Sequence, residues 1–184
     1  MATPLRILAF SGSLRAESCN TAVLKTAIDL APSDVVITQY DYSDLPFYNE
    51  DLGEPDSVKR LRSAISDADG VLLFQPEYNY SIPGPLKNAI DWASRPGYDS
   101  AFYKKPCGVL SASPAMTGGA RGQQATKVIL LAMASHVFPA PEFALGQAYG
   151  KVDDGRLTDD DSRERLGEFL SNYADWVRLI CADN

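Results

Sequence analysis

Side chains that could bind a phosphate gather in one short loop near the start of the chain. The loop follows an apolar run over 7–10 and leads into a stretch with helical spacing that begins near Asn20. Its hydroxyl, amide and guanidinium donors are Ser11, Ser13, Arg15, Ser18, Asn20 and Thr21. A strand that turns through such a loop into a helix directs free backbone N–H groups at one point, which stabilises an anion. The loop therefore favours phosphate binding; the alternative is a polar loop whose serines only cap the helix.

The familiar motifs for other phosphate ligands are absent from this loop. It contains neither the GxxxxGK[ST] pattern of P-loop proteins nor the GxGxxG pattern of dinucleotide binding. A small cysteine phosphatase would place its nucleophile here and an arginine shortly after it, so that thiolate and guanidinium hold one phosphate. In such an enzyme five residues separate the cysteine from the arginine. The residue at that distance from Cys19 is Lys25, and the loop's arginine, Arg15, precedes the cysteine. The pattern therefore argues against a phosphatase.

The chain has few of the residues that metal sites and hydrolytic triads require. His136 is its only histidine, and its three cysteines, Cys19, Cys107 and Cys181, stand far apart. A zinc site needs several nitrogen or sulfur ligands, and a Ser-His-Asp triad needs a histidine beside its nucleophile. We therefore expect no metal site and no triad. The scattered cysteines also indicate a reducing compartment without a disulfide framework.

A second loop is rigid and aromatic, as a site for a planar ring would be. It covers 76–88 and reads PEYNYSIPGPLKN, in which three prolines and a glycine restrict the backbone path. Tyrosine rings and an asparagine supply flat surface and hydrogen-bonding edges. A rigid loop with aromatic rings suits a planar heterocycle, whose rim atoms can bond to main-chain N–H and C=O groups. The alternative is that Glu77 and Tyr78 form an acid–base pair.

A third loop is built from small residues. It covers 111–121 and reads SASPAMTGGAR, so the backbone could approach a ligand closely. Arg121 either contacts a ligand or a partner subunit, or lies on an exposed helix surface.

The alternation of apolar runs and helical spacing predicts the elements that position these loops. Strands are predicted at 7–10, 35–37, 71–74 and 106–111, with a fifth from Val137 divided around Pro139 and Pro141. Helices are predicted over 20–31, 57–68, 85–93 and 118–135, with a last one from Thr158 onward. This order predicts one α/β domain over 1–184, with a parallel sheet covered on both faces. Ligands of such sheets bind beyond the carboxyl ends of the strands, so the three loops should meet in one site.

The last part of the chain predicts a turn followed by an amphipathic helix. The stretch 150–155 is expected to form a turn-rich hairpin, and the hydroxyl of Thr158 to cap the helix. The residues expected to form the buried stripe of that helix are Leu166, Phe169, Leu170, Tyr173, Val177 and Ile180.

The composition is that of a soluble globular protein. The 184 residues are 45% hydrophobic and 22% charged. A formal net charge of −7 argues against nucleic acid or an anionic membrane surface as partner. No apolar run is long enough for a transmembrane helix, and the opening MATPLRILAF lacks the features of an export signal. We therefore expect a cytoplasmic protein.

Three motifs together resemble a known family. They are Gly12-Ser13-Leu14-Arg15 with Ser18 and Asn20, Leu45-Pro46-Phe47-Tyr48-Asn49 with Asp51, and the block PEYNYSIPGPLKNAIDW over 76–92. In order and spacing the chain resembles the NAD(P)H-dependent FMN reductases, a family of flavodoxin-like proteins. It is most similar to the bacterial branch described as chromate or quinone reductases, and the third block is the most specific part of the match.

The resemblance implies a fold, a cofactor and a reaction. It implies a flavodoxin-like three-layer sandwich with a five-stranded parallel sheet, and a homodimer or homotetramer with FMN near the subunit interface. Hydride would pass from NADH or NADPH to FMN and then to free flavin, a quinone, a ferric chelate, an azo compound or chromate. Because the flavin carries the chemistry, no side chain is expected to be catalytic. The residues expected to bind FMN are Ser11, Ser13, Arg15, Ser18, Asn20, Thr21, Pro76, Glu77, Tyr78, Asn79, Ser113 and Gly118.

Two other flavin-binding roles stay open at this point. A flavodoxin carries electrons without a nicotinamide substrate, although its usual phosphate loop is rich in Thr and Gly and lacks an arginine like Arg15. A flavin-binding protein with a scaffolding role is the other possibility.

Overall fold

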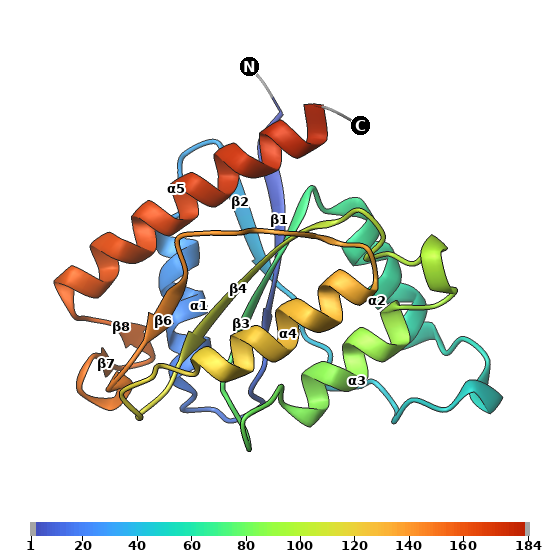
Figure 1. Ribbon diagram of the computed structural model, residues 1–184, viewed down its shortest axis with the longest axis horizontal. Coiled ribbons are helices and arrows are strands. Elements are labelled where there is room, and N and C mark those ends of the chain that lie inside the picture. The colour runs from blue at the N-terminus through green and yellow to red at the C-terminus, as the bar shows by residue number, and fades with distance from the viewer. Residues whose placement is uncertain (1–2, 183–184) are drawn as a thin grey trace.

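Parallel strands form the centre of the computed structural model, which describes residues 3–182 (Figure 1). The strands of this sheet are β1 (Leu5–Ser11), β2 (Val35–Gln39), β3 (Gly70–Gln75), β4 (Pro106–Ala112), β5 (His136–Val137) and β6 (Phe143–Leu145). Their order is β2-β1-β3-β4-β5, and β6 also pairs with β4. All these pairings are parallel. The predicted α/β class is confirmed, as is the division of the fifth strand around the two prolines.

Helices cover both faces of the sheet and build a core on each side. The helices are α1 (Cys19–Asp29), α2 (Asp56–Asp67), α3 (Gly84–Ala93), α4 (Ala120–Ala132) and α5 (Asp160–Ala182). One core joins the sheet to α1 and α5. The other joins it to α2 and α3, with Leu130 of α4. The middle strands read as continuous apolar runs because they are buried on both sides.

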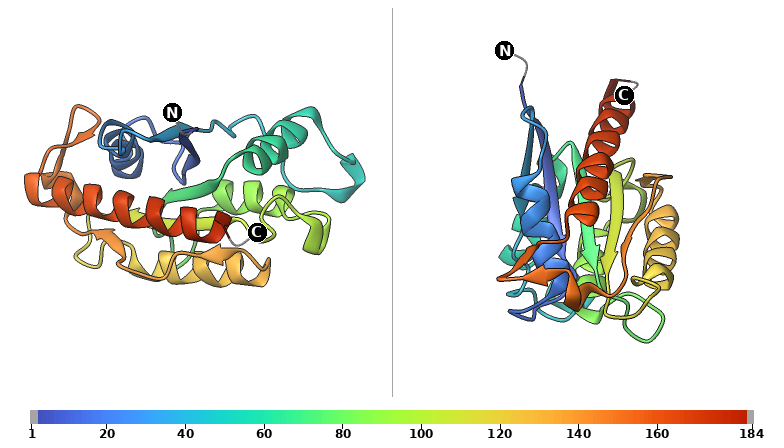
Figure 2. Two further views of the ribbon diagram at one scale, coloured as in Figure 1. Left: turned by 90° about the horizontal axis from the view of Figure 1, so that it is seen from above. Right: turned by 90° about the vertical axis from the view of Figure 1, so that its left-hand side faces the viewer.

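The long α5 runs back from a small hairpin toward the beginning of β1 (Figures 1 and 2). The hairpin consists of β7 (Val152–Asp153) and β8 (Arg156–Leu157), which are antiparallel. It packs on α1, where the Leu157 N–H donates to the Thr26 hydroxyl at 2.9 Å. The expected hairpin is present, but over 152–157 rather than 150–155, and it is fixed against the helix that follows the first loop. Single 3-10 turns lie at Glu50–Leu52, Gly97–Asp99 and Ala148–Gly150.

Helices α1, α2 and α3 start one residue before their predicted positions, and the starts of α4 and α5 differ more. Asp159 caps α5, since its carboxylate accepts from the Ser162 N–H at 3.1 Å. Thr158, the predicted cap, instead directs its hydroxyl to the Lys151 carbonyl at 3.3 Å. Helix α4 begins at Ala120 rather than at 118 because Gly118 and Gly119 have φ values of 62° and 87°, outside the helical region. In the buried stripe of α5, Ile180 is only partly buried.

The strand register brings the three polar loops to one edge of the sheet. Ser11 at the end of β1 pairs with Phe74, and Gln75 at the end of β3 pairs with Ser111. Ser111 in turn pairs with Ala144 of β6. The loops after these strands therefore leave the sheet side by side, as predicted. Within residues 3–182, no helix has the length and apolar character needed to cross a membrane.

Candidate functional site

The loop between β1 and α1 is anchored firmly to the sheet. Its Gly12 N–H donates to the Phe74 carbonyl at 2.7 Å, and a Cβ at this glycine would lie 3.0 Å from the Gln75 Cα. The Tyr42 hydroxyl donates to the Ser11 carbonyl at 2.6 Å from the opposite side. Glycine is required here because the loop backbone lies directly on the end of β3.

The hydroxyls of this loop bond mainly to the loop itself. The Ser11 and Thr21 hydroxyl oxygens are 2.6 Å apart, so the end of the strand is joined to the helix. Ser13 Oγ accepts from the Arg15 N–H at 3.3 Å, and Ser18 Oγ accepts from the Thr21 N–H at 3.4 Å as the cap of α1. These side chains set the shape of the loop. The N–H groups of the first turn of α1 have no acceptor within the helix, and they point toward the centre of the loop.

Asn20 connects two of the loops. Its side-chain N–H donates to the Ala112 carbonyl at 2.9 Å, and its side-chain oxygen accepts from the Ala112 N–H at 2.8 Å. The amide thus continues the β4 ladder toward α1. Its side chain is fully used in this contact, so Asn20 offers a ligand only its backbone N–H.

Arg15 is the exposed cation of the loop, which also carries the exposed Glu17. Within residues 3–182 it forms no ion pair with a carboxylate. It bonds to the Tyr149 hydroxyl, and this contact raises the pKa of Arg15. Tyr149 was missed by the sequence reasoning, because it reaches the site only through the pairing of β6 with β4.

The loop after β3 presents aromatic rings at the same edge. Tyr78 and Ser81 form a tight turn with two backbone hydrogen bonds of 3.1 and 3.0 Å. Asn79 and Tyr80 between them have positive φ values of 51° and 64°, as in a type I′ turn. The Tyr78 and Tyr80 side chains are 45% and 68% exposed. A rigid turn therefore presents two tyrosines beside the first loop.

Glu77 ties this aromatic loop to α4. Its carboxylate accepts from the Arg121 and Gly122 N–H groups at 3.0 and 3.2 Å, at the positive end of the helix. The Arg121 guanidinium adds a contact of 3.3 Å to Glu77 and lies 4.3 Å from the centre of the Tyr80 ring. The carboxylate is thus engaged as a helix cap, which argues against an acid–base pair of Glu77 and Tyr78.

The loop after β4 is positioned from β6. The Ser113 N–H donates to the Leu145 carbonyl at 3.0 Å, and its carbonyl accepts from the Ala148 N–H at 3.1 Å. Gly118 lies against the other side of this segment, where a Cβ would come within 2.8 Å of the Ala144 carbonyl carbon. Ser113 therefore faces the site, whereas Gly118 is required for packing against β6.

A small cavity of about 80 Å³ lies where the loops meet. The predicted residues that line it are Ser13, Arg15, Ser18, Asn20, Pro76, Glu77, Tyr78 and Ser113. It is completed by Cys19, Ala112, Pro114 and Tyr149, which were not predicted. The predicted residues outside this lining are Ser11, Thr21, Asn79 and Gly118. A larger cavity of about 590 Å³ adjoins it, because Arg15, Ser18, Cys19 and Tyr149 line both.

Cys19 lies in the cavity as a neutral thiol. Burial raises the pKa of Cys19, and the nearby Arg15 offsets only part of this. A protonated thiol is a poor nucleophile. Within the described part of the chain, no group of three or more His, Cys, Asp or Glu side chains is arranged to hold a metal ion.

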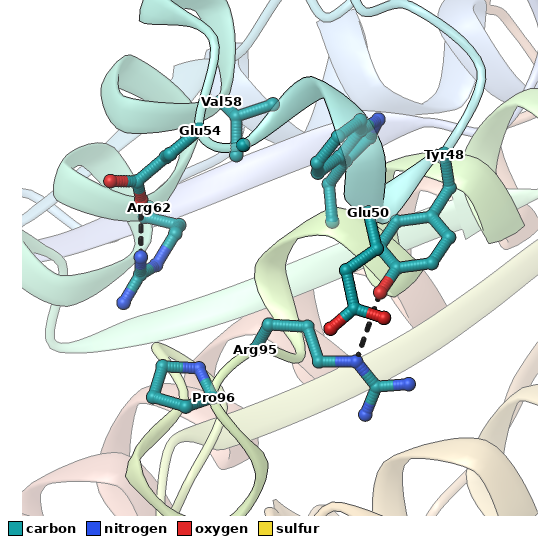
Figure 3. A pocket seen from close by; sticks show the side chains of 9 residues that line it. Tyr48, Glu50, Glu54, Val58, Arg62, Arg95 and Pro96 are labelled. Atoms are coloured by element: carbon teal, nitrogen blue, oxygen red, sulfur yellow. Dashed lines mark hydrogen bonds and ion pairs between the residues drawn. The ribbon is translucent and has the colours of Figure 1, made fainter.

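A separate cavity of about 350 Å³ lies among the segment after β2, α2 and the end of α3 (Figure 3). Arg95 Nε donates to the Tyr48 hydroxyl at 3.2 Å, and Arg62 pairs with Glu54. None of the residues predicted to bind the cofactor lines it. Two contacts within this lining, Arg95 with Tyr48 and Arg62 with Glu54, use much of its polar surface, although the buried Arg62 Nε has no hydrogen-bond partner within residues 3–182.

The fold and this edge of the sheet define a flavodoxin-like nucleotide-binding protein. The model of the NADPH-dependent FMN reductase family matches residues 5–150, and the chain belongs to this family. It is therefore an oxidoreductase, from a family that uses FMN with NAD(P)H as electron donor.

Individual relatives match along nearly the whole chain. An NAD(P)H-dependent FMN reductase of Pseudomonas aeruginosa is 43% identical, covering 98% of this chain and 99% of the relative. A quinone reductase of Pseudomonas putida is 40% identical over 91% of this chain and 92% of its own length. The solved structure of the flavoenzyme FerB, an NAD(P)H:acceptor oxidoreductase of Paracoccus denitrificans, superposes with a TM-score of 0.86 at 36% identity, covering 95% of this chain and 97% of FerB.

The described residues fit both parts of an FMN molecule. An arginine without a carboxylate partner and the first N–H groups of α1 suit a phosphate. The small cavity holds only a phosphate-sized group, so a flavin ring would extend over the open rim, where Tyr78 and Tyr80 are exposed.

Proposed function

We propose that this chain binds FMN at the carboxyl edge of its sheet and uses it to reduce quinones with NADH or NADPH. The supporting observation is the convergence of Arg15, the α1 N-terminus and the Tyr78–Ser81 turn at one cavity. The family match and the quinone reductase of P. putida point to the same chemistry.

The three loops would divide the binding of FMN among them. Arg15 and the N–H groups of Cys19 and Asn20 bind the phosphate, in a loop shaped by Ser11, Ser13, Ser18 and Thr21. The ring lies along Pro76, the Glu77 backbone, Tyr78 and Asn79, with Ser113 opposite. Gly118 supports this wall through its packing on β6. The binding energy thus comes from one charged contact, several backbone groups and an aromatic surface.

The reaction would depend on how the protein positions the flavin and its substrates more than on acid–base chemistry by side chains. FMN, when bound, supplies a ring that accepts a hydride from NAD(P)H and passes two electrons to the acceptor. The open rim beside Tyr78 and Tyr80 admits a second flat molecule, first the donor and then the acceptor. The rigid turn and the Glu77 cap hold that surface still, which favours contact between stacked rings. The same openness would admit free flavin, ferric chelates, azo compounds or chromate.

We also propose that the chain acts as a homodimer or homotetramer. Large apolar side chains on the loops after β2, β3 and β4 are exposed, with Phe47 at 92%, Tyr80 at 68% and Met116 at 85%. Exposed apolar groups of this size favour burial at an interface. Light scattering on the purified protein would measure its mass, and a mass of one chain at micromolar concentration would contradict this part of the proposal.

Steady-state kinetics tests the shared site. Because donor and acceptor would occupy one place in turn, initial rates at several fixed quinone concentrations should give parallel double-reciprocal lines against NADPH. Intersecting lines would show that both substrates bind together and would contradict a shared site.

A further inference from the structure

Helix α4, whose start is capped by Glu77, rests on the sheet mainly through polar side chains. Its buried residues are Gly122, Gln123, Thr126 and Leu130, of which only Leu130 is large and apolar. Each of the other helices buries at least two aliphatic or aromatic side chains larger than alanine. The polar contact between α4 and the sheet is therefore an exception within this fold.

Gln75, the last residue of β3, is fully buried in this contact. The Thr126 hydroxyl donates to its side-chain oxygen at 2.7 Å, while its Nε2 has no hydrogen-bond partner within residues 3–182. Turning the amide over would exchange the two atoms and leave the oxygen unpaired instead. Because a buried polar atom without a partner destabilises a fold, an apolar side chain of similar shape would hold α4 at least as well.

Gln123 repeats this arrangement at the next strand. Its Nε2 donates to the Ser111 hydroxyl at 2.7 Å and to the Phe143 carbonyl at 2.8 Å, whereas its Oε1 has no partner among the described residues. Ser111 is also the partner of Gln75 in the register of β3 and β4. These contacts form a polar seam, consisting of Gln75, Ser111, Gln123 and Thr126. The seam joins α4 to β3, β4 and β6 by directional bonds, which favour one position of the helix.

Gln75 also contacts the elements that carry the proposed flavin site. A Cβ at Gly12 in the phosphate loop would lie 3.0 Å from the Gln75 Cα, and a Cβ at Gly122 would lie 3.1 Å from its Nε2. The two residues that follow it, Pro76 and Glu77, form the wall proposed for the flavin ring. Gln75 therefore lies between the phosphate loop, the ring wall and the start of α4.

We propose that Gln75 is a positioning residue for hydride transfer. It holds the ring wall and the start of α4 at the spacing that keeps the flavin in contact with its donor, although its unpaired amide group destabilises the fold. This inference rests on the proposed function, because it takes the ring to lie along Pro76 and Glu77. Misplacing a reacting group by about 1 Å can slow a reaction about a hundredfold, and functional sites commonly retain groups that lower stability.

The variant Gln75→Met tests this role, because methionine keeps a similar length and flexibility without the amide. Rapid mixing of the FMN-loaded protein with NADPH or NADH, whichever reduces the wild-type flavin faster, measures the limiting rate of flavin reduction. We expect this rate to fall at least about fivefold. The Kd for FMN should change less than about threefold, and the unfolding temperature should be no more than about 2 °C below that of wild type. A residue with a purely structural role would instead lower the unfolding temperature.

Three companion variants separate the contact of Gln75 from other effects. Thr126→Ser retains the hydroxyl that bonds to Gln75 and should keep more than about half of the wild-type rate. Gln75→Met combined with Thr126→Val should be no more than about twofold slower than Gln75→Met alone, because the two residues share one interaction. Gln124→Met makes the same chemical change on the exposed side of α4 and should alter neither the rate nor the unfolding temperature.

The outcomes also separate this inference from the function on which it rests. A limiting rate reduced less than about fivefold in Gln75→Met would overturn the positioning role. Failure of this variant to fold, or an unfolding temperature lowered by more than about 2 °C, would assign Gln75 a structural role and also overturn it. A rate in Thr126→Ser as low as that in Gln75→Met would do the same, since the bond to Gln75 would be intact. Failure of the wild-type protein to bind FMN would instead contradict the proposed function.

Discussion

Individual side chains of the first loop divide into those that shape it and those left free for a ligand. Ser11, Ser13, Ser18 and Thr21 satisfy one another or the loop backbone. Arg15 is the exposed cation that remains. The strength of phosphate binding should therefore depend most on this one side chain and on the helix N-terminus behind it.

Replacement of Arg15 by Ala should weaken FMN binding by about ten- to a hundredfold, since one or two charge-assisted hydrogen bonds are lost. The rate of flavin reduction at saturating FMN should change less than about threefold, because the guanidinium lies at the phosphate end. Fluorescence titration and rapid mixing with NADPH measure the two quantities. Arg163→Ala, a change of the same kind on α5, is the matched control. An unchanged FMN affinity would mean that the phosphate lies elsewhere.

Replacement of Asn20 by Ala should destabilise the fold. The side chain is 3% exposed, and its loss leaves both the N–H and the carbonyl of Ala112 without their partner. An unpaired buried polar group costs about 1–3 kcal/mol. Urea unfolding should show a loss in this range, and Asn20→Asp, which retains the acceptor, should lose less. A loss of less than about 0.5 kcal/mol of unfolding free energy in Asn20→Ala would show that water replaces the two hydrogen bonds between Asn20 and Ala112.

Among the elements, α5 is the longest and its start is set by a carboxylate. The Asp159 side chain accepts from Ser162, and this contact, with help from Lys151, lowers the pKa of Asp159. Negative charge at this end also complements the helix dipole. A carboxyl whose pKa is lowered by folding stabilises the fold at neutral pH and loses this effect as the pH falls through the folded pKa.

Asp159→Ala should therefore lower the unfolding temperature by about 2–4 °C at pH 7, and the difference from wild type should narrow below about pH 4. Thermal unfolding followed by circular dichroism at both pH values measures this. Asp161→Ala removes an exposed carboxylate from the same turn and should have a smaller effect. A difference that stays constant with pH would show that the charge of Asp159 contributes nothing.

For the molecule as a whole, local sequence patterns predicted both the parallel sheet and the meeting of the three loops at one edge. Runs such as 71–74 predict central strands because burial on both faces demands apolar side chains throughout. The prolines at 139 and 141 predict the break between β5 and β6 because they cannot donate to a ladder. Register alone then places the ends of β1, β3 and β4 together.

Contacts between distant parts of the chain could not be predicted from local sequence patterns. Asn20 and Ala112 are 92 residues apart, and an amide that extends a strand ladder has no sequence signature. Tyr149 reaches Arg15 only after β6 has paired with β4. The choice between Thr158 and Asp159 as cap was also open locally, because both residue types cap helices well.

The most direct test of the whole account is anaerobic rapid mixing of the FMN-loaded protein with NADPH and with NADH, followed by a second mixing with a quinone. We predict that at least one donor bleaches the visible absorbance of the bound flavin and that the quinone restores it, since each half-reaction uses the same open rim. Flavin that stays oxidised with both donors, or reduced flavin that the quinone leaves unchanged, would contradict the proposed electron transfer through this site.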